Sequence, residues 1–304
     1  MGKRYSMEQY SGFDEIPHGD ASDILTPGCL VLEGGAWRGL YTQGVLDALM
    51  ENDINFETTI GVSAGAMSAM GYVAGQIGRC ARINLRHRHD PKYVGIGAYR
   101  VDHGITGFTY LFDTLSEEEP FRDDRFYDPR RRFYAVATNL ETGEAEYFEK
   151  SSPDILQAIR ASATVPYISE PVEISGSKYL DGGCAVRVPL PWALEHDYEK
   201  IVVVRTRARD YRKSIIPPLP LIEREYRNYP RFQKCLREER VNYNVLLDMV
   251  DAMEENGRIF VIAPSQPVRM ARFEKDLEVL GNLWKLGYED AKEILPALKA
   301  YLEK

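Results

Sequence analysis

The stretch Phe56-Glu-Thr-Thr-Ile-Gly-Val-Ser-Ala-Gly65 holds the residues on which the fold prediction depends. Its first five residues are mostly β-branched or aromatic and predict a strand, whereas residues 64–76 contain nothing that would stop a helix. The turn between the two falls on Ser63. Gly61 and Gly65 have no Cβ that could clash with a sharp turn, which is why the Gly-x-Ser-x-Gly spacing recurs around nucleophilic serines. The stretch therefore predicts a strand, a tight turn and a helix, with a serine hydroxyl exposed at the turn.

The start of the predicted helix adds a chemical argument. Its free N–H groups and the positive end of its dipole would lie beside the Ser63 hydroxyl, where an alkoxide or a tetrahedral oxyanion would develop. A five-residue match also arises by chance in a chain of 304 residues, and an ordinary glycine-rich turn is the alternative. The motif alone leaves both interpretations open.

A second strand-turn-helix pattern lies upstream. Residues 29–32 read as a short buried strand, Glu33-Gly-Gly-Ala-Trp-Arg-Gly39 as a turn, and residues 40–50 as an amphipathic helix. Successive glycines let several backbone N–H groups point into one concavity, which can hold a phosphate or the oxyanion of an acyl-transfer intermediate. A tight turn without ligand is the alternative. A dinucleotide loop is disfavoured because Gly-x-Gly-x-x-Gly is absent and no acidic residue follows a second strand at the expected distance.

The third pattern is Tyr179-Leu-Asp-Gly-Gly183, in which an acidic residue ends a short apolar run. Two glycines then let the chain turn sharply, so the pattern taken alone indicates a β-turn. Because the three patterns are far apart in the sequence, only tertiary structure could bring them together.

Taken together, these motifs resemble those of the patatin-like phospholipases, which carry a glycine-rich oxyanion motif, Gly-x-Ser-x-Gly and Asp-Gly-Gly/Ala in this order. The resemblance covers roughly residues 28–205 and includes the small-residue segment Ala161-Ser-Ala-Thr-Val-Pro-Tyr-Ile168. It implies an α/β fold of three layers, α/β/α, with a mostly parallel central sheet and added C-terminal helices. It also implies a serine lipid-acyl hydrolase that works through a Ser-Asp dyad and an acyl-serine intermediate, without a metal or organic cofactor.

The resemblance also implies roles for individual residues. Ser63 would be the nucleophile, Asp181 its base, and Arg38 would brace the glycine loop. The third position of the usual glycine run carries a methyl group here, and its amide could still donate if φ is negative there. The oxyanion hole would be formed by the amides of Gly34, Gly35 and Ala36, with supporting roles for Gly39, Gly61, Gly65, Gly182 and Gly183.

Two alternatives to this mechanism stay open. Among the five histidines, only His196 follows Ser63 and Asp181 in the order of an α/β-hydrolase triad. It ends a predicted helix at residues 191–196, where a histidine also interacts favourably with the helix C-terminus. The other alternative is a non-hydrolytic lipid- or acyl-binding regulator, for which the narrowed Gly-Gly-Ala loop is the motivating feature.

The overall composition limits the classes of function. A formal net charge of −8 disfavours non-specific binding to nucleic acid. The four cysteines form no Cys-x-x-Cys pair and no readable zinc site, and Cys29 and Cys184 lie in apolar runs where buried thiols are common. Neither an apolar leader segment nor an apolar run of membrane-spanning length is found. We expect a cytoplasmic protein that acts on a lipid or acyl ester and could contact the inner face of the membrane.

Further strand-like segments set the predicted domain organisation. They alternate with helical patterns, which favours a largely parallel sheet covered on both faces. We expect an N-terminal extension at residues 1–27, a catalytic core at 28–215 and a C-terminal helical region at 216–304 packed on the same domain. Leu283 and Trp284 are expected in the core. The strand-like segments are 132–138, 145–149, 201–206 and 259–263, and the C-terminal helical patterns are 219–253 and 272–304.

Four segments could contact a substrate or a membrane. Residues 104–115 could line an acyl pocket, form a lid or pack in the core, and Ile215-Ile-Pro-Pro-Leu219 could dip into a lipid interface. A basic stretch could face an anionic membrane, with a solvated helix face as the alternative, and three arginines after a strand could bind phosphate. The basic stretch comprises Arg79, Arg82, Arg86, Arg88 and Lys92, and the three arginines are Arg205, Arg207 and Arg209.

Overall fold

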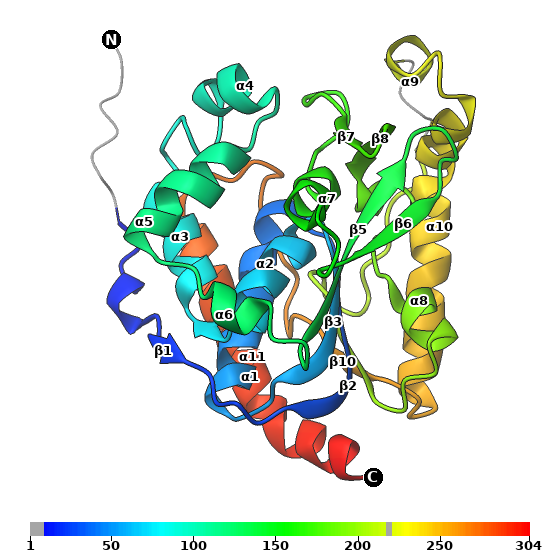
Figure 1. The fold of residues 1–304 in the computed structure, drawn as a ribbon. Helices are drawn as coiled ribbons and strands as arrows, with labels where there is room; N and C mark the ends of the chain where they lie inside the picture. Colours follow the sequence, from blue (N-terminus) through cyan, green and yellow to red (C-terminus); the bar gives the residue numbers. More distant parts are fainter. Residues whose placement is uncertain (1–8, 217–220) are drawn as a thin grey trace.

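The computed structural model describes residues 9–216 and 221–304. Within these residues, one eight-stranded sheet with the order β10-β9-β2-β3-β5-β8-β7, and with β6 paired to β5, runs through the middle of the molecule (Figure 1). The prediction of a mostly parallel central sheet is confirmed. The parallel strands are β10 Phe260–Ile262, β9 Ile201–Val204, β2 Thr26–Leu32, β3 Phe56–Val62 and β5 Arg132–Asn139. The antiparallel strands are β6 Ala145–Glu149, β8 Ser177–Asp181 and β7 Val172–Ile174.

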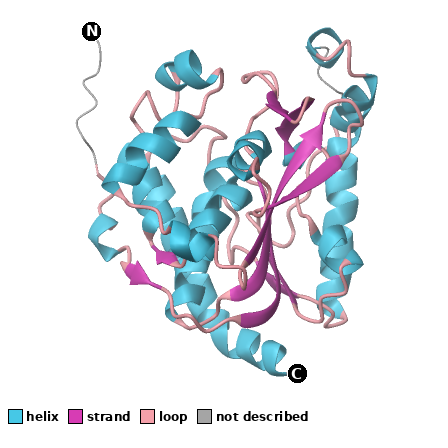
Figure 2. Cartoon of the chain, viewed as in Figure 1, coloured by secondary structure: helices cyan, strands magenta, loops and turns pink. Residues whose placement is uncertain are grey.

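Helices cover both faces of this sheet (Figure 2). Alternate residues of β2 belong to different cores: Leu30 and Leu32 to one, Cys29 and Val31 to the other. This alternation is the expected result of a strand that is buried on both faces. The first core contains α1 Gly39–Glu51, α2 Ala64–Val73 and α11 Leu277–Glu303, and the second contains α8 Leu190–Glu195 and α10 Pro230–Glu255. The chain therefore forms the expected three layers, and the prediction that Cys29 is buried is confirmed.

The C-terminal helix α11 packs closely against α1. A Cβ on Gly44 would lie 2.0 Å from the Trp284 carbonyl oxygen, and one on Gly287 would lie 2.1 Å from that of Tyr41, so the two backbones meet where side chains are absent. The Trp284 indole N–H donates to Asp47 at 2.8 Å. Leu283 and Trp284 are buried, which confirms their predicted place in the core.

Register along β5 places the ends of three strands at one edge of the sheet. Val62 pairs with Val136 of β5, and Asp181 of β8 pairs with the next β5 residue, Ala137. Because Ser63 follows Val62 directly, the register brings Ser63 and Asp181 to neighbouring positions. This edge is also where the parallel strands have their carboxyl ends, as is usual for ligand sites in open α/β sheets.

Two of the predicted boundaries needed correction. The helix predicted at 64–76 ends at Val73, because Gly75 has a φ of +65° and Gln76–Ile77 then pairs as β4 with β1 Gly19–Asp20. The strand predicted at 201–206 ends at Val204. The strand predicted at 259–263 is present as β10, which joins the central sheet.

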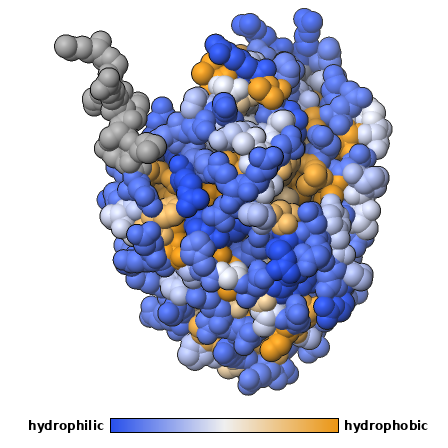
Figure 3. Space-filling view, turned by 60° about the vertical axis from the view of Figure 1, so that its left-hand side comes forward, coloured by the Kyte–Doolittle hydropathy of each residue, from blue (hydrophilic) through white to orange (hydrophobic). Residues whose placement is uncertain are grey.

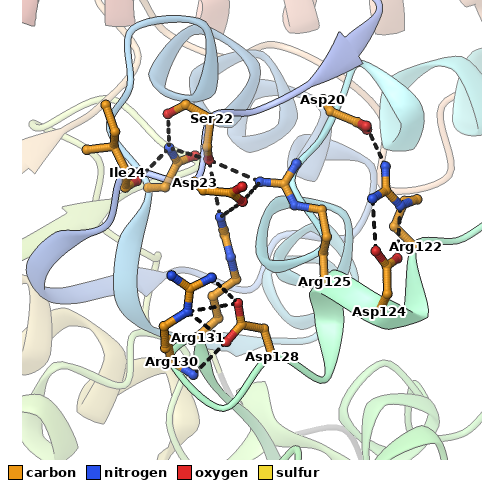
Figure 4. A network of polar contacts seen from close by, with 11 residues as sticks. Asp20, Ser22, Asp23, Ile24, Arg122, Asp124, Arg125, Asp128, Arg130 and Arg131 are labelled. Carbon is orange, nitrogen blue, oxygen red and sulfur yellow. Dashed lines mark hydrogen bonds and ion pairs between the residues drawn. The ribbon is translucent and has the colours of Figure 1, made fainter.

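Residues 9–25 of the predicted extension pack on the main body. Tyr10, Phe13 and Ile16 belong to the larger core. Figure 4 shows the polar network that holds the following residues against the segment around α6 Asp123–Phe126. In it, Arg125 donates to the Ser22 carbonyl oxygen and pairs with Asp23, both at 3.0 Å.

The remaining helical elements are short. They are α3 Arg79–His87, α4 Ile96–Asp102, the π-turn Tyr110–Thr114, α5 Leu115–Glu118, α7 Ile155–Ser162 and α9 Leu221–Glu225, with 3-10 turns at Phe13–Glu15, Ala36–Arg38 and Gly182–Cys184. Among the described residues, no helix combines the length and the apolar character needed to cross a membrane.

Candidate active site

Ser63 occupies a strained turn between β3 and α2. Its backbone has φ 54° and ψ −122°, a left-handed conformation that side chains rarely adopt outside functional turns. The two neighbouring glycines are required by close contacts. A Cβ on Gly61 would lie 2.6 Å from the Ala66 nitrogen, and one on Gly65 would lie 2.6 Å from the Leu32 carbonyl oxygen. The predicted strand-turn-helix unit is present, although the Ser63 residue is only 7% exposed.

The side chains of Ser63 and Asp181 are in direct contact. The Ser63 hydroxyl donates to Asp181 Oδ2 at 2.7 Å, and the other carboxylate oxygen accepts the Gly183 N–H at 2.8 Å. Burial raises the pKa of the Asp181 carboxyl, although Arg187, the Ser63 hydroxyl and the Gly183 N–H all favour the ionised form. Gly182 allows this turn, since its Cβ would lie 2.2 Å from the Val136 carbonyl oxygen. The arrangement can transfer a proton between an alcohol and a carboxylate without a third residue.

His196 does not join this pair. Its Nδ1 lies 2.8 Å from the Trp192 carbonyl oxygen, and its ring stacks on the Trp192 ring with centroids 4.0 Å apart. These contacts are those of a histidine that closes the end of its own helix, α8. The geometry does not support the alternative of a Ser63-Asp181-His196 triad, because the serine hydroxyl donates to the aspartate itself.

The glycine loop differs from its predicted role in two ways. The Gly34 N–H already donates to the Arg187 carbonyl oxygen at 3.0 Å, so it does not fit as an oxyanion donor. Ala36 has φ +49°, so the condition of a negative φ at this position is not met. A left-handed alanine costs roughly 1 kcal/mol. The Gly35 amide, for which no backbone acceptor is found among the described residues, remains as the candidate donor of this loop.

Arg38 was expected to brace the glycine loop. Among the described residues, its contact with the loop is a hydrogen bond from its backbone. The Arg38 N–H donates to the Gly35 carbonyl oxygen at 3.1 Å. Its guanidinium Nε is buried without a hydrogen-bond partner among the described residues. Burial, together with the nearby Arg207 and Arg187, lowers the pKa of Arg38 to about 10. The guanidinium therefore lies in a cationic environment beside the loop.

Two supporting residues were not predicted. The Ser162 hydroxyl oxygen accepts the Ser63 N–H at 2.8 Å, and so fixes the turn. Glu33, which is 1% exposed, accepts the Thr206 N–H and the Tyr243 hydroxyl, and so joins the glycine loop to α10. In the sequence, Ser162 belongs to the small-residue segment at 161–168, and Glu33 precedes the glycines of the loop. Neither pattern indicates which atoms these two side chains contact.

An apolar pair of cavities lies on one side of Ser63. The smaller, of about 90 Å³, is lined by Ser63 and by Ile105 and Thr106 of the segment 104–115. The larger, of about 320 Å³, is lined by Leu111 and Phe112 of the same segment. Four residues line both cavities, so the two are adjacent: Gln43, Met67, Asn84 and Tyr93. Segment 104–115 was expected to line a pocket, form a lid or pack in the core. The lining of a pocket fits the four residues of this segment that line the cavities, whereas the buried Phe108 fits packing in the core.

A cationic cavity of about 440 Å³ lies on the other side of Ser63, and it is also lined by Asp181. Of the three arginines that were expected to bind phosphate, only Arg207 lines it. Arg205 is completely buried and pairs with Asp251 at 2.8 Å, and Arg209 pairs with Glu254. The prediction is therefore wrong for Arg205 and Arg209, because both are neutralised by α10.

Most residues of the basic stretch after α2 face neither a membrane nor the solvent. Arg79, Arg82 and Arg88 are buried. Arg82 pairs with Glu119 at 3.0 Å, and the Arg88 guanidinium lies 4.3 Å from the centroid of the Trp37 ring. Buried guanidinium groups need such partners, and here they come from distant segments.

Exposed apolar side chains are found at the end of the molecule where both cavities lie. Ile215 and Ile216 are 62% and 50% exposed, and Ile96 and Val101 of α4 are 65% and 64% exposed. Figure 3 shows a mostly hydrophilic face with scattered apolar patches, some of them at the end where Figure 1 places α4. Pro217, Pro218 and Leu219 of the predicted lipid-contacting loop lie outside the described residues.

Comparison with known families agrees with this architecture. The family model described as patatin-like phospholipase matches residues 30–194, more than half of the chain. A second one, described as a domain of unknown function (DUF6363), matches residues 229–303. The chain therefore belongs to the patatin-like phospholipase family.

Individual relatives extend the similarity. The chain is 24% identical over 275 residues to the uncharacterized protein YjjU of Escherichia coli K12, covering 85% of this chain and 74% of YjjU. It is 30% identical over 169 residues to the lysophospholipase nte1 of Aspergillus terreus, covering 53% of this chain but 11% of that protein. The solved structure of VipD from Legionella pneumophila superposes with a TM-score of 0.49 at 12% identity, covering 98% of this chain and 72% of VipD.

Proposed function

We propose that this protein is a serine lipid-acyl hydrolase of the phospholipase A or lysophospholipase type. The observation that carries the proposal is the 2.7 Å hydrogen bond from Ser63 to Asp181, located where an apolar and a cationic cavity meet. The names of two relatives, a lysophospholipase and a probable lipid hydrolase of invertebrate iridescent virus 6, support a lipid ester as substrate. We also propose that the protein is located in the cytoplasm.

In the proposed reaction, Asp181 accepts the Ser63 proton while the serine oxygen attacks the ester carbonyl carbon. The N–H group of Gly35 would stabilise the oxyanion, aided by the N-terminus of α2. Asp181 then gives the proton to the departing alkoxide, which leaves an acyl group on Ser63. In the second half, Asp181 takes a proton from water, the hydroxide attacks the acyl carbonyl, and the proton returns to Ser63.

Asp181 is better suited to this role than an ordinary aspartate, whose pKa of about 3.9 makes it a poor base for an alcohol. Burial raises the pKa of Asp181 and so brings it closer to the operating pH. The fixed bond from Gly183 keeps the second oxygen in place, which leaves Oδ2 for the serine proton.

The two cavities define how an ester would lie. An acyl chain fits the apolar cavities past Met67, and the alcohol part of the ester then points toward the cationic cavity. Exposed Ile215 and Ile216 flank that side, and we include their contact with a lipid surface in the proposal.

Hydrolysis of p-nitrophenyl butyrate by purified variants tests the proposal. Ser63→Ala should lower the turnover by about 10³-fold or more, because no other group forms the acyl intermediate. His196→Ala is the matched control and should keep most of the turnover. If the wild-type protein hydrolyses neither this ester nor lipid esters, yet binds them, the non-hydrolytic regulator becomes the better account, and the strained Ala36 supports that alternative.

A further inference from the structure

The cationic cavity carries far more positive than negative side chains. Four cations come from the patatin-like core and the segment after β9, namely Arg38, Arg187, Arg207 and Lys213. Asp181 and Glu239 are the acidic residues of its described lining. A concave site with this excess of charge attracts an anion.

The described carboxylates do not balance the charge of these four cations. Glu239 is shared by Arg187, at 2.9 Å, and by Lys213, so one carboxylate serves two cations. The buried Nε atoms of Arg38 and Arg187 have no hydrogen-bond partner among the described residues. Arg207 donates to the Val268 carbonyl oxygen and lies over the Tyr211 ring, neither of which removes its charge. An incoming anion would supply the missing negative charge.

The C-terminal part of the chain completes this cavity. Arg237 and Arg240 extend from α10, and Arg272 precedes α11. All three fall within residues 229–303, the part matched by the domain of unknown function. Arg272 also faces the site closely enough to favour the ionised form of Asp181. This region therefore contributes to the site as well as to the core.

We infer that the cationic cavity binds the phosphate of an anionic phospholipid, and that the C-terminal region sets the preference for such lipids over zwitterionic ones. The inference rests on the proposed function. A phosphate next to the cleaved ester would enter this cavity, because Ser63 lines both cavities. A headgroup with its own positive charge, such as choline, would meet the arginines and be repelled.

Binding to the Ser63→Ala protein tests this inference without any need for turnover. Isothermal titration would use dihexanoyl phosphatidylglycerol and dihexanoyl phosphatidylcholine below their micelle concentrations, so that membrane surface charge plays no part. We expect the anionic lipid to bind at least tenfold more tightly. Adding Arg237→Gln and Arg272→Gln together should remove about tenfold or more of that affinity, as expected for charge-assisted hydrogen bonds.

The matched control is Lys234→Gln. Lys234 lies on the same helix, is 73% exposed and is absent from the lining of the cavity, so its loss should leave the preference unchanged. Equal affinity for the two lipids, or an equal effect of Lys234→Gln, would overturn the inference. Inorganic phosphate should compete weakly with the anionic lipid. Phosphate that binds without displacing the lipid would show a site for free phosphate and would also overturn it.

Hydrolysis separates this inference from the proposed function. In the Ser63 protein, the double variant should lower the ratio of kcat/KM for the anionic lipid over the zwitterionic lipid by about tenfold. A change in the basicity of Asp181 would affect kcat/KM for both lipids alike, so it would not alter their ratio. If the wild type cleaves both lipids equally, the hydrolase proposal stands and the headgroup inference fails. If it cleaves neither, the hydrolase proposal fails, and the binding preference still decides the inference.

Discussion

The two cavities that meet at Ser63 are built from different parts of the chain. The apolar pair is lined mainly by α1, α2, α3 and the segment that follows to Tyr127, with further contributions from Ala36, Trp37 and a few later residues. The cationic cavity draws on the glycine loop, the segment after β9 and the C-terminal region. In the proposed reaction, acyl-chain fit and headgroup charge would therefore depend mainly on different residues, whereas the Ser63–Asp181 pair would serve both sides.

The largest effect should come from the shared centre. Asp181→Asn removes the base but keeps the size of the side chain, so turnover of every ester should fall by about 10³-fold or more. The loss should be equal for long and short acyl chains and for anionic and zwitterionic lipids. A loss confined to one of these substrate pairs would mean that Asp181 belongs to one cavity only.

The next effect should be confined to the apolar side. Met67→Trp would fill the space shared by both apolar cavities, so kcat/KM for palmitoyl esters should fall by about tenfold or more while butyryl esters are largely spared. Met67→Leu conserves the volume and is the control. Thermal melting would check that the larger side chain does not unfold the protein. A change in headgroup preference would break the separation of the two sides.

A smaller effect is expected for contact with vesicles. Replacing Ile215 and Ile216 with serine should weaken binding to lipid vesicles by about tenfold or less. Both side chains are already partly covered by the protein, so only part of their transfer free energy is gained when they enter the lipid. Co-sedimentation measures this binding. Ile96→Ser with Val101→Ser changes an equally exposed apolar pair on α4. Equal binding by the 215/216 variant and the wild type would remove this loop from the lipid contact, and a loss with the α4 variant alone would place the contact on the apolar side.

The smallest effect should appear in the pH dependence of the cationic side. Burial and Arg187 lower the pKa of Lys213 to about 8, against the opposing influence of Glu239. Lys213 is charged below this value and neutral above it, so the preference for anionic over zwitterionic lipid should decline a few-fold between pH 7 and pH 9. Lys213→Arg should flatten the decline, since arginine stays charged. A preference that rises with pH in the wild type would contradict this assignment.

Much of the fold followed from local sequence. The glycines around Ser63 are required by contacts within one strand-turn-helix unit, and such contacts leave a recognisable pattern. The alternating burial of β2 likewise appears as a short apolar run. For these reasons, the central sheet and the position of the Ser63 turn could be predicted.

The remaining details depend on partners from elsewhere in the chain. The Gly34 N–H is occupied by the carbonyl oxygen of Arg187, and Arg205 is neutralised by Asp251 of α10. Likewise, Arg82 is buried because Glu119 pairs with it. No pattern within a single segment specifies such pairs, so the sequence could not separate a ligand-binding arginine from a structural one.

The most direct test of the account is the labelling of Ser63 by a fluorophosphonate, followed by intact-mass and peptide mass spectrometry at several pH values. The account predicts one added group on Ser63, with a labelling rate that rises with pH as Asp181 ionises, at a midpoint above the ordinary aspartate value of about 3.9 because burial raises the pKa of Asp181. Asp181→Asn should label far more slowly. Absence of labelling in the folded wild-type protein, or equal labelling of the Asp181→Asn variant, would contradict it.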